Sequence, residues 1–238
     1  MAERRKAVDL LSKETIREIA ERYVTDYESY TMDELARNYK LSSHNFKEVI
    51  RRAIVELIVT YQVAEAIRDK SEANQHRHFQ KGRPTATGYY KWLFNERLKY
   101  FKANVYDPEK APVIAKNYLH SSINSIAAGL GLSPRETFYY IWKGACYYFT
   151  DTEYHQFREK LKKDFPNDKQ LYVKLAKLDS FRKTYTEAAA RLEIATCQFD
   201  TLDDTISSED EVLGRRELIE DEIAETNKLI RTMRECPE

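Results

Sequence analysis

The side chains best suited to contacting a nucleic acid cluster in the stretch SSHNFKEVIRR, residues 42–52. Asn, Lys and Arg side chains make directional hydrogen bonds to base edges and phosphates. A recognition helix presents such residues, near its N-terminus, to the major groove of DNA. The residues of this stretch predicted to contact DNA are Ser43, His44, Asn45, Lys47, Arg51 and Arg52.

A second stretch, SPRETFYYIWKGA over residues 133–145, has the same helical pattern but different chemistry. Arg135, Tyr139 and Lys143 are predicted to face outward and contact DNA, since a tyrosine hydroxyl can bind a phosphate. The opposite side of this helix is expected to pack inward through Phe138, Ile141 and Ala145. Aromatic clusters also mark protein contacts. The alternative is therefore that a neighbouring helix or a second subunit is covered by Tyr139, Tyr140 and Trp142.

A polar segment between these stretches contains Lys81-Gly82-Arg83-Pro84. Lys81 and Arg83 are predicted to contact DNA from an extended basic arm, which can enter a narrow minor groove. An ordinary basic loop is the alternative.

Residues suited to catalysis or metal binding do not form a pattern. The histidines are not spaced with cysteines or carboxylates as a metal site requires, and Asp151, Glu153 and His155 point apart on a helix. No phosphate-cradling glycine loop or nucleophile motif is found. The sequence predicts no enzyme, no catalytic residue, no metal and no cofactor.

Both candidate reading helices follow the same turn signature. A small residue precedes the turn, a residue in the left-handed backbone region forms it, and an apolar plug and a capping serine follow. The four positions recur ninety-one residues apart as Ala36 and Ala127, Lys40 and Gly131, Leu41 and Leu132, and Ser42 and Ser133. The sequence therefore predicts two helix-turn-helix units.

A further motif precedes each unit: IAERYV at residues 19–24 and IAKNYL at residues 114–119. Together with LARNYKLS (35–42) and IAAGLGLS (126–133), it resembles the sporulation stage III regulator and other small bacterial trihelical DNA-binding proteins. The resemblance covers about twenty-five residues in each copy. It implies major-groove reading by the helix after each serine.

The helices that position these residues are read from apolar periodicity and caps. A helix is expected over residues 12–27, and the helix after Ser42 is expected to continue to about residue 70. Thr31 with Glu34 and Ser133 with Glu136 form capping boxes. A helix over 87–102 and another starting at Asp107-Pro108 follow.

The C-terminal third has heptad patterns. Apolar residues alternate in steps of four and three from Leu171 to Phe199 and from Val212 to Met233, interrupted by Arg182, Thr196, Arg216 and Thr226. Two such helices can fold back as an antiparallel hairpin or pair with another subunit.

Bulk composition limits the class of protein. The 238 residues contain few glycines and prolines, and 33% are charged, which favours an all-helical protein. Net charge is about +8 over residues 61–190 and about −8 over residues 191–238. No apolar run suits a membrane span or a signal peptide, and three distant cysteines fit a cytoplasmic location.

The expected fold is all-α, with two tandem trihelical units followed by a coiled-coil hairpin. The expected domains are residues 1–72, a basic linker at 73–86, residues 87–166, and an oligomerisation region at 167–238. The predicted function is sequence-specific binding of double-stranded DNA by a bacterial or phage transcriptional regulator, a homo-oligomer through residues 168–235. The alternatives are a phage DNA-packaging protein resembling a small terminase subunit, another DNA-organising oligomer, or an adaptor that binds RNA polymerase or another regulator.

Overall fold

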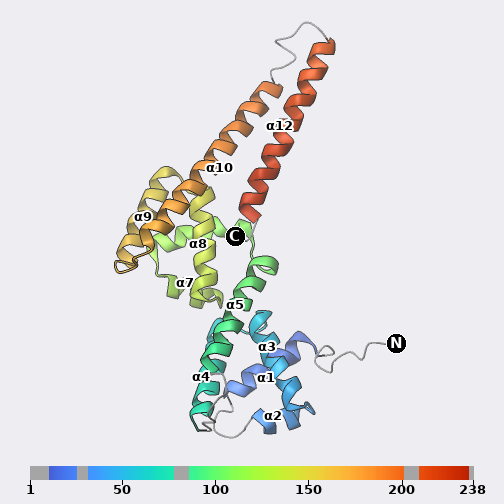
Figure 1. Cartoon of the computed structure of the whole chain (residues 1–238), viewed down its shortest axis with the longest axis vertical. Helices are drawn as coiled ribbons and strands as arrows, with labels where there is room; N and C mark the ends of the chain where they lie inside the picture. Colours follow the sequence, from blue (N-terminus) through green and yellow to red (C-terminus); the bar gives the residue numbers. More distant parts are fainter. Residues whose placement is uncertain (1–10, 26–31, 78–85, 201–208, 236–238) are drawn as a thin grey trace, which may run out of the picture. The chain divides into compact units, whose positions relative to one another are not determined.

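The computed structural model describes residues 11–25, 32–77, 86–200 and 209–235. Every regular element in those ranges is a helix, which confirms the all-α prediction (Figure 1). Contacts between Cα atoms divide the chain into two compact units. Unit 1 comprises residues 1–106 and 122–138, and unit 2 comprises residues 107–121 and 139–238.

The described part of unit 1 contains six helices and the first turn of a seventh. They are α1 (Lys13–Thr25), α2 (Met32–Asn38), α3 (Ser43–Val55), α4 (Tyr61–Arg77), α5 (Ala86–Asn104), α7 (Ile123–Leu130) and the first turn of α8 (Pro134–Tyr148). Its core joins α1 to α3, where the rings of Tyr23 and Phe46 meet edge to face at 5.9 Å between centroids. Ile16, Ile19, Val49 and Ile54 are also buried there.

Unit 2 contains a short 3₁₀ helix and four further helices, together with most of α8. They are η2 (Pro108–Lys110), α6 (Ala111–His120), α9 (Asp151–Asp164), α10 (Leu171–Asp200) and α12 (Glu209–Glu235). Asp107 caps η2 ahead of Pro108, as predicted. A Cβ added at Gly144 of α8 would lie 2.3 Å from the Ala111 carbonyl oxygen. Glycine is therefore what allows α6 and α8 to approach so closely.

This division differs from the boundaries expected from the sequence. Helix α5, expected in the second domain, packs against α3 and α4 within unit 1. The expected linker over 73–86 is also shorter than predicted, because residues 73–77 continue α4. Lys81 and Arg83, and Thr31 of the first capping box, lie outside the described residues.

The helix after Ser42 is shorter than predicted. It ends at Val55, Leu57 takes a positive φ of 53°, and α4 begins at Tyr61. The turn is stabilised by a side chain that donates to its backbone, since Arg17 Nε donates to the Ile58 carbonyl oxygen at 3.0 Å. Apolar periodicity runs on through Ile58 because this turn is itself buried.

A buried arginine connects this turn to the second repeat. Arg97 of α5 donates from one terminal nitrogen to the carbonyl oxygens of Ile54 and Val59, at 3.2 and 3.0 Å. Its Nε lies 2.9 Å from Glu136 of α8, and both side chains are 1% exposed. The other Glu136 oxygen accepts the Ser133 amide at 2.7 Å, which confirms the predicted capping box.

The heptad helices α10 and α12 lie side by side and run antiparallel, the first of the two arrangements expected (Figure 1). Arg182, the polar interruption in the first seam, donates to carbonyls of Ala145, Cys146 and Phe149 at the end of α8, the last at 2.8 Å. The interruption is therefore a cap for the last carbonyls of another helix. Arg216, which interrupts the second seam, lies 4.9 Å from the Phe199 ring centroid.

Replacing Arg97 by methionine is expected to lower the free energy of unfolding by about 3–5 kcal/mol, because Glu136 would stay buried without its cation. Lys99→Ala, which removes an exposed pair with Glu96, is the control and is expected to cost about 0–1 kcal/mol. Arg97→Met combined with Glu136→Gln should recover part of the loss, since the amide oxygen can still accept the Ser133 N–H. Urea unfolding measures all three. Equal losses for Arg97→Met and Lys99→Ala would contradict the role given to the buried pair.

Candidate nucleic-acid interface

The solvent side of α3 carries the polar residues predicted to contact DNA. Residues spaced by three or four along a helix share one side, and here these are His44, Lys47, Glu48 and Arg51. His44 and Lys47 are exposed, and Glu48 and Arg51 are half-buried. The opposite side is fixed in the core by Phe46, Val49, Ile50 and Ala53. The core therefore holds this polar face at the surface.

Both predicted arginine contacts of α3 have carboxylate partners within the chain. The Arg51 guanidinium donates to both carboxylate oxygens of Glu48, and the shortest nitrogen–oxygen distance is 2.6 Å. This hydrogen bonding raises the pKa of Arg51 above its usual value. Arg52 pairs with Glu56 at 2.8 Å near the end of the helix. Lys47 and His44 are consequently the most accessible basic groups on this face.

The start of α3 is fixed by two serines. The Ser42 hydroxyl accepts the Asn45 amide at 3.2 Å and caps the helix, as predicted. The Ser43 hydroxyl donates to Asp33 of α2 at 2.6 Å. Ser43 is exposed, Asn45 is half-buried, and both lie at the end of α3 from which His44 projects.

The two predicted turns have the same backbone geometry. Lys40 and Gly131 take φ values of 54° and 65°. The amides of Leu41 and Leu132, which follow, donate to the Ala36 and Ala127 carbonyls at 2.8 and 3.0 Å. The positive φ predicted from the glycine is therefore adopted by lysine in the first copy. The local repeat seen in the sequence is present in the structure.

The helix after the second turn is mostly buried. Ile141 and Ala145 pack inward as predicted, but Lys143 is only 5% exposed, so the prediction that it faces outward is wrong. Its ammonium donates to the Met233 carbonyl oxygen at 3.0 Å and lies over the rings of Tyr139 and Tyr147. These aromatic contacts offset the burial of the charge.

The remaining predicted contacts of α8 are divided. Arg135 is exposed and donates to Asn95 of α5 at 3.1 Å. Tyr139 is half-buried beside Lys143 of the same helix, and Tyr140 is buried, with its hydroxyl accepting the Asp107 amide at 3.2 Å. Of the DNA contacts predicted on α8, Arg135 is thus the one left at the surface.

Two aromatic residues beside α3 were missed in the sequence. Tyr89 and Trp92 of α5 are 44% and 45% exposed, with ring centroids 5.9 Å apart. Burial raises the pKa of the Tyr89 hydroxyl. Tyr89 lies close enough to Arg51 for the positive guanidinium to oppose part of this rise. The signal was the helical spacing of GYYKWL: once Tyr90 and Leu93 face the core, Tyr89 and Trp92 point outward.

Metal ligation and membrane insertion have no support in the described part of the chain. Within it, no group of three or more His, Cys, Asp or Glu side chains could hold a metal ion. None of the helices in the described ranges is long and apolar enough to cross a membrane.

Comparison of this chain with protein-family models, curated proteins and solved structures found no match. The resemblance to bacterial trihelical DNA-binding proteins therefore stays a prediction.

Amine labelling distinguishes the two lysines that were predicted to contact DNA from α3 and α8. Under limiting acetylation of the folded chain, Lys47 should react rapidly and Lys143 slowly, because Lys47 is exposed and Lys143 is 5% exposed. Peptide mass spectrometry gives both rates, and unfolding in urea should equalise them. Equal rates in the folded protein would contradict the buried position of Lys143.

Proposed function

We propose that this chain is a sequence-specific DNA-binding protein, a transcriptional regulator of bacterial or phage origin, that reads the major groove with α3. The observation that carries the proposal is the face formed by His44, Lys47 and Arg51. It lies on a capped helix whose other side is fixed in a core. Major-groove reading requires a few polar side chains that are held rigidly on the N-terminal half of a helix.

The proposal assigns different roles to the two helix-turn-helix elements. The α3 element reads DNA, whereas the α8 element is structural and offers at most a phosphate contact through Arg135. Three features support this assignment: the buried ion pair of Glu136, the buried Lys143 and the larger set of exposed polar residues on α3. The proposal also includes self-association through α10 and α12, which would bring two reading helices to one DNA site.

The exposed pair Tyr89 and Trp92 favours a second candidate, an adaptor that binds RNA polymerase or another regulator. Aromatic residues are enriched at protein interfaces. The two candidates differ in salt dependence. DNA binding weakens steeply as salt rises, because counterions are released from the phosphates. Selection from a random duplex library with the purified full chain tests the first candidate, and no DNA affinity even at low salt would exclude it.

Lys47→Ala is expected to weaken binding to the selected duplex and to reduce the slope of log K against log salt by about 1, as the loss of one phosphate contact does. Arg135→Ala is the matched control from the second repeat and should change affinity little. Fluorescence anisotropy over a salt series measures both. Greater loss from Arg135→Ala would move the reading helix to the second repeat.

Glu48→Gln is expected to strengthen DNA binding several-fold. The change removes a negative charge from the proposed DNA face and releases Arg51 from its bidentate pair. Glu56→Gln, which releases Arg52 at the end of α3 instead, is the comparison and should have a smaller effect. Weaker binding by Glu48→Gln would mean that the carboxylate itself contacts a base.

A further inference from the structure

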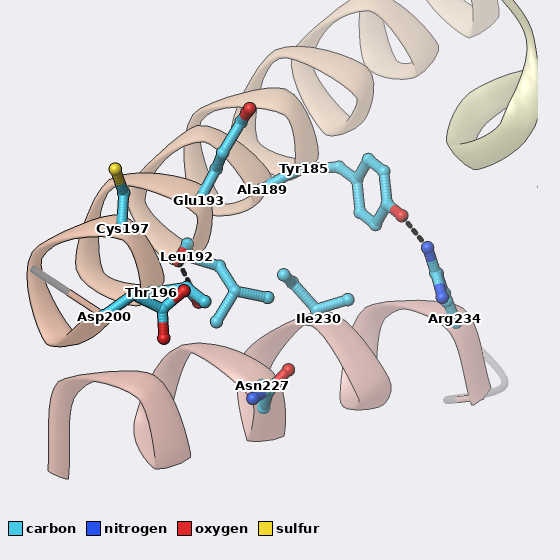
Figure 2. Close-up of a pocket in the computed structure, with 10 residues that line it drawn as sticks. All are labelled: Tyr185, Ala189, Leu192, Glu193, Thr196, Cys197, Asp200, Asn227, Ile230 and Arg234. Atoms are coloured by element: carbon cyan, nitrogen blue, oxygen red, sulfur yellow. Dashed lines mark hydrogen bonds between the residues drawn. The ribbon is translucent and has the colours of Figure 1, made fainter. Parts of the chain in front are cut away.

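A groove of about 550 Å³ runs between α10 and α12 within unit 2 (Figure 2). Its middle is apolar, with Leu192 from one helix opposite Ile230 from the other. One end holds Arg234, which donates to the Tyr185 hydroxyl, and the other holds Asp200. The complete lining is Tyr185, Ala189, Leu192, Glu193, Thr196, Cys197, Asp200, Asn227, Ile230 and Arg234.

Helix α12 makes little use of its apolar residues within one chain. Among its described side chains, residues 214–234, Ile230 is the one classed as buried. Leu218 and Leu229 are 71% and 47% exposed. An amphipathic helix that is completely packed buries a continuous stripe. The surface of α12 is therefore suited to a further helical neighbour.

The charges of α12 divide sharply at its middle. Residues 217–225 carry five carboxylates and no cation, and residues 226–234 carry three cations and no carboxylate. Along α12, this gives an acidic half and a basic half. A second copy turned by 180° about the middle of the groove would place each basic half against an acidic half.

The groove also has a residue at the required centre. Glu220, Asn227 and Arg234 are seven residues apart, so they lie on one side of α12. A two-fold axis at Asn227 brings Arg234 level with the partner's Glu220. Asn227 then lies against the partner's Asn227, where two amides can hydrogen-bond.

We propose that the α10–α12 groove binds a second copy of this chain, antiparallel, to form a four-helix dimer with its two-fold axis at Asn227. This rests on the self-association included in the proposed function and specifies its surface and geometry. The antiparallel orientation follows from the charge division, because a parallel pair would set acid against acid. It does not depend on DNA, so the two proposals fail separately.

Charge reversal on the groove side tests the pairing. Glu220→Arg and Arg234→Glu each place like charges opposite each other twice per dimer, and each is expected to weaken self-association by about tenfold or more. An equimolar mixture of the two variants should associate again, because each then meets its opposite. Glu222→Arg is the matched control. It makes the same change at an exposed position of α12 that lies off the side shared by Glu220, Asn227 and Arg234, and should associate like the wild type.

Sedimentation equilibrium of the full chain without DNA measures these affinities. A dimer that is lost in both variants and restored in their mixture supports the proposal. A wild-type chain that stays monomeric at high micromolar concentration overturns it, as does a ring of eight or more subunits. Variants that behave like Glu222→Arg also overturn it.

Cross-linking tests the position of the axis. In a background with Cys197 and Cys236 replaced by serine, Asn227→Cys should be joined to its partner by a short bismaleimide, because the axis brings the two thiols together. Glu222→Cys, away from the groove, should give much less covalent dimer. Equal yields from the two positions would rule out an axis at Asn227.

Discussion

The buried pair of Arg97 and Glu136 is the interaction on which unit 1 depends most. Removing two charges from water is costly, and the cost is met only when every donor and acceptor is satisfied. Here Arg97 also binds two carbonyls of the α3–α4 turn, and Glu136 also caps α8. One arginine therefore determines where α3 ends, where α4 begins and where the second repeat is held.

This constraint explains how two copies of one local pattern come to differ in side-chain exposure. In the second copy, Glu136 in the first turn of α8 is held by its ion pair with Arg97. Further along α8, Lys143 donates to a backbone carbonyl and lies over two tyrosine rings. On the outer face of the first copy, Glu48 pairs with Arg51 at a half-buried position, and no buried ion pair is present among the described residues of α3. His44 and Lys47 remain exposed there, while the core residues of α3 fix its direction. The two copies thus share a turn geometry but differ in which polar side chains stay at the surface.

The parts that the sequence predicted are those governed by local rules. Both turns, the Ser133–Glu136 capping box and the Asp107 cap depend on neighbouring residues. The length of α3 and the burial of Lys143 do not. They depend on Arg97 and Met233, which lie 43 and 90 residues away along the chain. Arg182 likewise interrupts the heptad pattern of α10, and it caps the end of α8, where Phe149 lies 33 residues away along the chain.

The claim that α3 is the reading helix is tested most directly by amide hydrogen exchange of the full chain with and without a selected duplex. The account predicts slower exchange on DNA binding at residues 43–51 and little change at residues 134–143. Protection confined to 134–143, or absent from 43–51 at saturating duplex, would contradict it.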